Sequence, residues 1–197
     1  MLYSEVGLKS HQIKDAAEIY ASAFERKYRH LIGNHQVIVE FLCRIINPDN
    51  AIAVSDENGE LLGLAGFHFD KKSLLTVNLK FFTGQFGWWR GLKKYAIIKL
   101  FLGRKKDDKL QLIMDGIAVK EGHRGQGVGK AIFEKLREFV LSKYLNSIKL
   151  DVIDENPRAK KLYESIGFNS TRHIKIPKFL YEAAGVSGVT TMVWRLT

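Results

Sequence analysis

The segment Arg124–Lys130 constrains the fold of this chain more than any other part of the sequence. It carries Gly125, Gly127 and Gly129, and it lies between an apolar stretch that ends at Val119 and a run of apolar residues at helical spacing. A glycine-rich turn from a strand into a helix directs several backbone N–H groups at one place, and glycine lets an anion come close to them. The segment therefore predicts a strand, a phosphate-binding turn and a helix in that order.

Two better-known phosphate motifs do not fit this segment. The P-loop requires a glycine where the chain has Arg124 and a serine or threonine where it has Ala131. The dinucleotide-binding pattern G-x-G-x-x-G fails because its last glycine would fall on Lys130 or Ile132. A glycine-rich turn that holds no ligand is the alternative interpretation.

Strands and helices alternate in the second half of the sequence, which is typical of an α/β fold with helices on the faces of a sheet. We expect strands at 110–119, 147–153, 168–176 and 189–196, and helices at 128–144 and 157–165. In the first half we expect a strand at 2–8, helices around 13–24 and 37–46, a hairpin of 51–54 and 61–69, and a further strand at 74–82. Asn58-Gly59 supplies the tight turn of the hairpin.

Composition indicates the cellular compartment in which the protein works, but it does not identify what the protein binds. The 31 lysines and arginines exceed the 21 acidic residues, giving a net charge of +10 that favours anionic partners such as a phosphorylated cofactor. The single cysteine, Cys43, excludes an internal disulfide and suits a reducing compartment. No apolar run is long enough to span a bilayer, so we expect a cytoplasmic protein. No His, Cys and acidic residues have metal-ligand spacing, and we expect no metal.

Residues 70–109 form an unusual basic and aromatic insert. Within 88–106 the basic residues and the apolar ones fall on two imperfect arcs of a helical wheel, which predicts a basic amphipathic helix. We favour a helix that covers the sheet edge or a homodimer surface. A lid over the acceptor pocket and attachment to an anionic membrane through Trp88 and Trp89 are the alternatives.

Two motifs in the correct order resemble one enzyme family. The pattern Arg124-x-x-Gly127-x-Gly129 after a strand resembles the acetyl-CoA-binding signature of the GCN5-related N-acetyltransferase (GNAT) superfamily. The segment 156–168 resembles the next conserved segment of that family through Asn156, Ala159, Leu162, Tyr163, Gly167 and Phe168. It also predicts a capped helix on its own, because Asn156 and Pro157 suit a helix start and Gly167 a helix end. The resemblance covers residues 56–168 well and the rest of the chain more loosely.

The resemblance implies a fold, a cofactor and a set of site residues. The fold would be the GNAT fold, one domain over residues 1–197 with a central mixed, twisted sheet of about six to seven strands flanked by helices on both faces. The extra basic helix would lie between the third and fourth strands. The cosubstrate would be acetyl-CoA, bound by Ile117, Ala118, Val119, Arg124, Gly125, Gln126, Gly127, Val128, Gly129, Lys130, Asn156, Ala159 and Tyr163.

The resemblance also implies direct attack of an unprotonated amine on the thioester. A backbone N–H near Val119 would stabilise the charge on the carbonyl oxygen. Tyr163 would donate a proton to the leaving thiolate, the alternative being that it only packs against the cofactor. Asp115, on the strand parity of Ile117 and Val119, is the candidate base, and a structural hydrogen-bonding role is the equal alternative.

The sequence also allows other bases and other functions. We expect His68 to be a solvated or satisfied histidine, Glu121 and His123 to be exposed, and a relay through water is a further alternative to a single base. The acceptor would be a small-molecule or peptide amine that the sequence does not identify. Rival functions are a catalytically silent acyl-CoA-binding sensor and, on charge alone, a nucleic-acid-binding protein, although no nucleic-acid motif is present.

Overall fold

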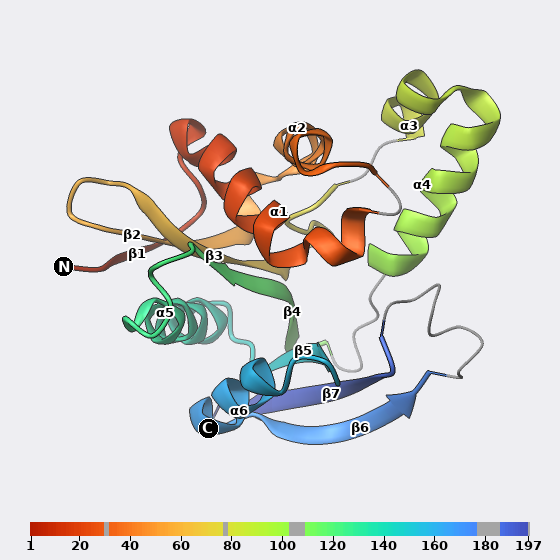
Figure 1. Ribbon diagram of the computed structural model, residues 1–197. Coiled ribbons are helices and arrows are strands. Elements are labelled where there is room, and N and C mark those ends of the chain that lie inside the picture. The colour runs from red at the N-terminus through yellow and green to blue at the C-terminus, as the bar shows by residue number, and fades with distance from the viewer. Residues whose placement is uncertain (30–31, 77–78, 103–108, 177–185, 197) are drawn as a thin grey trace.

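The computed structural model of the protein describes residues 1–29, 32–76, 79–102, 109–176 and 186–196 (Figure 1). The strands within these ranges form one seven-stranded sheet in the order β1-β2-β3-β4-β5-β7-β6. The strands are β1 (Tyr3–Val6), β2 (Ala51–Ser55), β3 (Leu61–His68), β4 (Gln111–Val119), β5 (Ser147–Ile153), β6 (Asn169–Lys175) and β7 (Gly188–Arg195). The α-helices are α1 (Ile13–Arg29), α2 (His35–Ile45), α3 (Leu79–Phe86), α4 (Trp88–Leu102), α5 (Val128–Ser142) and α6 (Pro157–Ile166), with short 3-10 helices at Ser10–Gln12 and Pro48–Asn50.

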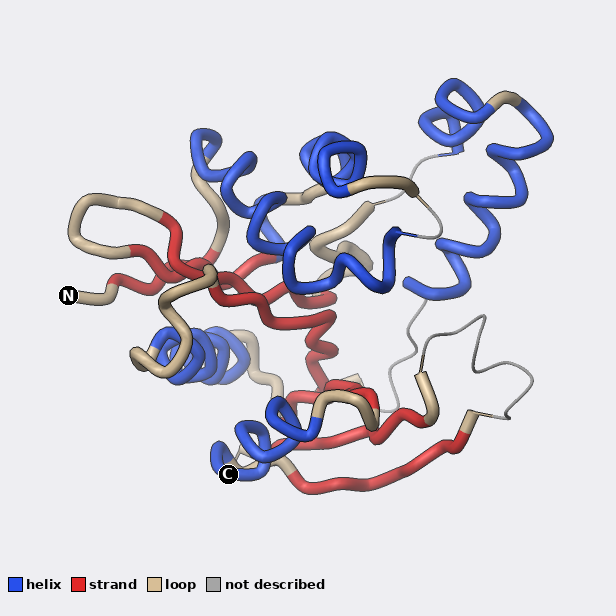
Figure 2. The backbone as a smooth tube through the Cα atoms, viewed as in Figure 1, coloured by secondary structure: helices blue, strands red, loops and turns tan. Residues whose placement is uncertain are grey.

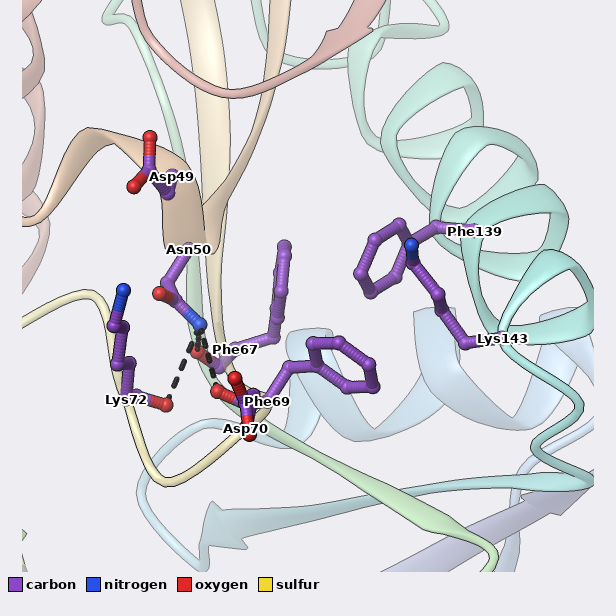
Figure 3. A pocket seen from close by; sticks show the side chains of 8 residues that line it. All are labelled: Asp49, Asn50, Phe67, Phe69, Asp70, Lys72, Phe139 and Lys143. Carbon is purple, nitrogen blue, oxygen red and sulfur yellow. Dashed lines mark hydrogen bonds between the residues drawn. The ribbon is translucent and has the colours of Figure 1, made fainter.

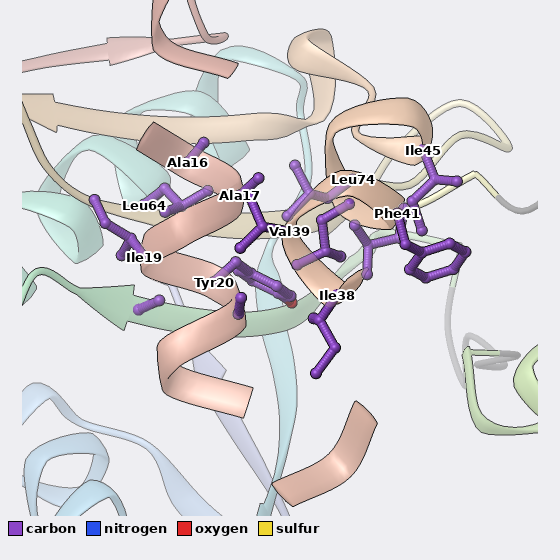
Figure 4. Packing of buried hydrophobic residues seen from close by; sticks show 14 of the residues in the cluster. Ala16, Ala17, Ile19, Tyr20, Ile38, Val39, Phe41, Ile45, Leu64 and Leu74 are labelled. Carbon is purple, nitrogen blue, oxygen red and sulfur yellow. The ribbon is translucent and has the colours of Figure 1, made fainter. Parts of the chain in front are cut away.

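The sheet is mixed, and helices cover both of its faces (Figure 2). Neighbouring strands are antiparallel except β4 and β5, which pair in parallel. Buried residues of α1 and α2 form one apolar cluster with one face of the sheet (Figure 4). Buried residues of α5 and α6 form a second cluster with the opposite face. This arrangement confirms the α/β fold with a mixed sheet and helices on both faces.

Helical spacing of apolar residues explains why α5 packs as it does. Ile132, Phe133, Leu136 and Val140 recur at intervals of one, three and four residues, so they lie along one side of the helix, and all four are buried. The first residue of α5, Val128, is also buried and lies over β3 where Gly63 has no side chain. The N-terminus of α5 is therefore held closely against the sheet.

The hairpin of β2 and β3 forms as predicted. The backbone N–H groups of Asn58 and Glu60 each donate to Asp56 Oδ1 over 2.9 Å, and Gly59 adopts the positive φ of 81° that the turn requires. The bond from the Glu60 N–H, with that from Asn58, lowers the pKa of the Asp56 carboxyl below its ordinary value. The turn is thus fixed locally by its own sequence.

The prediction of a strand at 74–82 is wrong. Leu75 forms only an isolated bridge with Ile46, residues 77 and 78 lie outside the described residues, and α3 begins at Leu79. Phe82 is buried in this helix and its ring lies 5.6 Å from that of Phe41 on α2. The short apolar run therefore docks as a helix on α2, because a buried run of this length suits either structure until its packing partner is known.

Two helices, α3 and α4, lie between β3 and β4 in the chain and stand to one side of the sheet in Figure 1. Trp88 and Trp89, in the first turn of α4, are 64% and 75% exposed. The predicted division of residues 88–106 into a basic and an apolar face stays a prediction, because residues 103–108 and most side chains after Ala96 lie outside the described part. No helix in the described ranges combines the length and the apolar character needed to cross a bilayer.

Candidate active site

The glycine-rich segment lies between the end of β4 and the start of α5, as the sequence predicts. Gly122, Gly125 and Gly127 have φ values of 82°, 80° and 85°, in the region that favours glycine. Gly127 is the N-cap residue of α5, and no side chain caps this end of the helix. The backbone N–H groups of the first turn have no acceptor within the helix, so they face outward from an exposed loop.

The surroundings of this turn suit an anion. An added Cβ at Gly122 or Gly125 would meet nothing within 4 Å, so space is open in front of the loop. The Gln126 side chain donates to the Gly122 carbonyl over 2.9 Å and braces the turn. Arg124 and Lys130 are exposed on either side of the glycines and add positive charge to the positive end of the helix dipole.

Strands β4 and β5 diverge before β4 reaches this loop. Their parallel pairing joins Gln111, Leu112 and Ile113 to Ser147, Ile148 and Lys149, and it stops there. β4 continues to Val119, paired only with β3 among the described strands, while β5 continues along β7. Backbone groups of Ile117, Ala118 and Val119 on the side toward β5 are thus available to an extended ligand with amide groups.

Helix α6 closes the other side of this gap. Asn156 caps its start, because the Asn156 Oδ1 accepts from the Ala159 N–H over 3.1 Å, and Gly167 ends it with a φ of 115°. An added Cβ at Gly129 would lie 3.7 Å from Leu162 on α6 and 4.0 Å from Ile117 on β4. Both predicted motifs and the strand before them therefore meet at one place.

Tyr163 is buried beside this meeting point. Its ring lies 5.8 Å from that of Phe133 on α5 and 5.9 Å from that of Phe168, and only 6% of the residue is exposed. Burial raises the pKa of the phenol to about 12. The hydroxyl therefore keeps its proton throughout the neutral range, as a proton donor must.

Asp115 lies at a bulge in β4, which changes the face on which its side chain lies. Gly66 pairs with Gly116 and Phe67 pairs with Met114, so Asp115 is the extra residue between them. Ile117 and Val119 pack against the cluster on the α5 side, whereas a Cβ on Gly116 would meet Phe24 of α1.

The expectation that Asp115 shares a face with Ile117 and Val119 is therefore wrong, because strict alternation does not hold across a bulge. The side chain instead contacts His68 Nε2 on β3. His68 therefore has a side-chain partner at Nε2, and whether it has a role in catalysis is not decided by this contact. The sequence contained a signal for this pair, since both are polar residues within otherwise apolar strands, but their pairing depends on the register.

A small open pocket lies at the opposite end of α5 (Figure 3). Its lining comes from the 3-10 helix at Pro48–Asn50, from β3 and its following turn, and from the end of α5. The Lys143 Nζ lies 5.8 Å from the Phe69 ring and 5.7 Å from the Phe139 ring. A helix of 15 residues places this pocket about 22 Å from the glycine-rich turn, so it is not part of the candidate site. Within the described residues no three His, Cys, Asp or Glu side chains group as metal ligands would.

Comparison with known proteins assigns the family. The model of the Acetyltransferase (GNAT) family matches residues 13–168. The chain belongs to this family. The match spans α1 to the end of α6 and includes both motifs, so it confirms the resemblance to this superfamily.

Relatives and solved structures agree with this membership. Over 56 residues the chain is 39% identical to the thialysine N-epsilon-acetyltransferase of Bos taurus, which covers 28% of this chain and 33% of that protein. Over 81 residues it is 27% identical to the N-acetylaspartate synthetase of Xenopus tropicalis, covering 41% of this chain and 30% of that protein. The alignments thus span about a third of the length of these relatives.

Among solved structures, the ribosomal-protein-S18-alanine N-acetyltransferase of Escherichia coli has a TM-score of 0.56 at 18% identity, with 100% of this chain and 95% of that chain covered. A GCN5-related N-acetyltransferase from Kribbella flavida has a TM-score of 0.60 at 15% identity, with 99% and 98% covered. At these identities the structures establish the GNAT fold alone.

Proposed function

We propose that this protein transfers the acetyl group of acetyl-CoA to a primary amine of a small-molecule or peptide acceptor. The observation that carries the proposal is the position of an uncapped, glycine-lined helix N-terminus beside two parallel strands that separate. The first feature suits a diphosphate and the second suits an extended arm with amide groups. Family membership and the similarity to a thialysine N-epsilon-acetyltransferase support the same reaction.

Binding would use three parts of the site. Residues 124–130 would hold the diphosphate through the backbone N–H groups of the turn, with Arg124 and Lys130 adding charge. Ile117, Ala118 and Val119 would bond the arm along the free side of β4. Asn156 and Ala159, at the start of α6, would line the opposite side of the gap.

In the reaction, an unprotonated amine attacks the thioester carbonyl, and the carbon–sulfur bond breaks to release the thiolate. A backbone N–H near Val119 would stabilise the negative charge on the carbonyl oxygen. Tyr163 would donate its proton to the thiolate, and Asp115 would assist the removal of the amine proton, directly or through the group that it contacts. A phenol with a pKa of about 12 is a weak acid, so it would protect the thiolate by a hydrogen bond before the proton is fully transferred.

Isothermal calorimetry with CoA tests the binding half of this proposal. We expect wild-type protein to bind CoA, and to bind pantetheine, which lacks the diphosphate, much more weakly. Arg124→Ala should weaken CoA binding, whereas Lys143→Ala, at the other end of α5, should not change it. Absence of heat with CoA, together with no stabilisation at a hundredfold excess over a micromolar Kd, where about 2.7 kcal/mol is expected, would refute the proposal.

A thiol-release assay tests the chemical half. Acetyl-CoA is incubated with the protein and a panel of amines: polyamines, aminoglycosides, amino acids and peptides with free N-termini or lysines. We expect release of one thiol per acetylated amine for at least one class. CoA binding without thiol release from any member would favour the catalytically silent acyl-CoA-binding sensor instead.

The remaining features are consistent with action away from membranes. The single cysteine suits a reducing compartment, and we infer that the cytoplasm is where the protein works. The exposed Trp88 and Trp89 offer a contact that would suit a lipid surface. Flotation with anionic vesicles, compared between wild type and a variant with both tryptophans replaced by alanine, separates the two possibilities.

A further inference from the structure

His68 and Asp115 form a pair across β3 and β4. His68 Nε2 contacts Asp115 Oδ1, and the side chains are 21% and 12% exposed. Two polar side chains within apolar strands are expensive to bury unless they bond each other. Each residue is thus fixed by its own strand, His68 by β3 and Asp115 by β4, and both side chains remain partly exposed to solvent.

The contact fixes which nitrogen of His68 is free to accept a proton. A neutral imidazole has one N–H donor and one acceptor nitrogen. Donation from Nε2 to the Asp115 carboxylate leaves the lone pair on Nδ1. No other hydrogen bond joins His68 to a residue that the structure describes, so within that part of the chain the Nδ1 lone pair is not used by a donor.

The pair lies where the gap between β4 and β5 begins. His68 is in register with Ile113, which is the last residue of β4 that pairs with β5. Asp115 follows two residues later, at the bulge. The narrow end of the gap and the polar pair therefore coincide.

A pantetheine arm is long enough to reach this pair from the start of α5. Twelve bonds separate its phosphate oxygen from its sulfur, as many as in four extended residues, or about 14 Å. The start of α5 lies beside Ile117, because a Cβ on Gly129 would be 4.0 Å from that side chain. An arm that starts there and runs back along β4 for four residues would pass Asp115 and end at Ile113, which is in register with His68.

The pair and Tyr163 lie on opposite faces of the sheet. Tyr163 belongs to the cluster on the α5 and α6 side. Gly66, two residues before His68, faces Leu74 in the cluster of the α1 side, and so does His68 by strand alternation. A thioester in the gap would therefore have a proton donor on one face and a proton acceptor on the other.

We propose that His68 is the catalytic base and that Asp115 is a positioning residue that orients it, an inference that rests on the proposed acetyl transfer. As the amine nitrogen bonds to the thioester carbon, its proton moves to His68 Nδ1. The carbon–sulfur bond breaks, and the thiolate takes its proton from Tyr163. Asp115 stabilises the imidazolium, and solvent then returns one proton from His68 to Tyr163, so that amine and acetyl-CoA give amide and CoA.

Kinetics of His68 variants test this assignment. We expect His68→Ala and His68→Gln to lower kcat by about a hundredfold or more, the usual contribution of a general base, and to leave the Kd for CoA within about threefold. Added imidazole should restore part of the kcat of His68→Ala. The double variant His68→Ala/Asp115→Ala should be no slower than His68→Ala alone, because residues that act as a unit are not additive.

A matched control is available in the same sheet. His173 Nε2 contacts Asp154 at 3.0 Å, but His173 lies on the edge strand β6, which β5 and β7 separate from β4. His173→Ala should keep kcat within about twofold of wild type, since it removes a similar pair outside the gap.

Each outcome decides between the proposals. Wild-type thiol release with undiminished kcat in both His68 variants would overturn the assignment of the base and leave acetyl transfer standing. A loss of kcat that imidazole does not restore, accompanied by a lower melting temperature in both variants, would show a structural role and overturn it too. Failure of the wild type to bind CoA or to release thiol would instead overturn the proposed function itself.

Discussion

Replacement of Gly63 by alanine tests how the start of α5 is held. An ideal Cβ at this position would lie 2.9 Å from the Ala118 carbonyl oxygen and 2.9 Å from Val128 Cγ1. Contacts this short do not persist, and the carbonyl belongs to β4, which is fixed by its pairing with β3. Val128 and the helix start, whose N–H groups we propose to bind the diphosphate, must therefore move.

The size of the effect follows from two opposing contributions. Overpacking of a filled site costs about 1–3 kcal/mol, and the loss of chain entropy in the unfolded state offsets about 0.4–1 kcal/mol. We expect Gly63→Ala to lower the free energy of unfolding by about 1–2 kcal/mol. We also expect weaker CoA binding, because hydrogen bonds to the diphosphate are sensitive to shifts of a few tenths of an ångström.

Urea unfolding followed by circular dichroism gives the first quantity, and calorimetry with CoA gives the second. Gly84→Ala is the control, because this exposed glycine lies within α3 and an added Cβ would meet nothing within 4 Å. That change should leave stability unchanged or raise it by up to about 1 kcal/mol. Unaltered stability and unaltered CoA affinity in Gly63→Ala would show that α5 does not pack on β3 as described.

Three further predictions follow from the same contacts. The phenol of Tyr163 has a pKa of about 12 in the folded protein against 10.0 when free, so its contribution to stability is complete below pH 10 and is lost as the pH rises to 12. In urea unfolding at pH 9, 10 and 11, the free energy of unfolding of the wild type should fall by about 1.4 kcal/mol per pH unit above 10 relative to Tyr163→Phe. Parallel pH profiles of the two proteins would contradict this. Asn156→Ala should cost about 1 kcal/mol in the same assay because it removes the cap of α6, and Asn156→Asp should not; equal losses would argue against the cap. Burial, with Glu18 adding to it, raises the pKa of the Cys43 thiol, so iodoacetamide at pH 7.5 should alkylate the folded protein more slowly than the urea-unfolded chain, and equal rates would show a freely accessible thiol.

Local sequence predicts those parts of the fold whose causes are local. The caps of α6 at Asn156 and Gly167, the turn at Asp56 and the glycine-rich start of α5 all form as expected, because each depends on residues within a few positions of it. The position of Tyr163 beside the start of α5 follows from the family resemblance and from no local pattern. The roles of all site residues stay predictions until they are measured.

Features that depend on distant partners could not be predicted from the sequence. The bulge at Asp115 exists only in register with Gly66 on β3, so the pattern of β4 alone gave the wrong face. The helix at Leu79–Phe86 is selected by the contact of Phe82 with Phe41 on α2. In both places tertiary contacts overrode a local pattern that suited a regular strand.

The short parallel pairing of β4 with β5 is a narrow junction between two parts of the sheet. Three register pairs join the strands β1 to β4 to the strands β5 to β7 along it, whereas seven pairs join β5 to β7. A molecule that lay along the free edge of β4 would take the place of a neighbouring strand's backbone and would connect the two parts of the sheet. Its binding would then slow hydrogen exchange in the strands on both sides of this junction, far from the ligand itself.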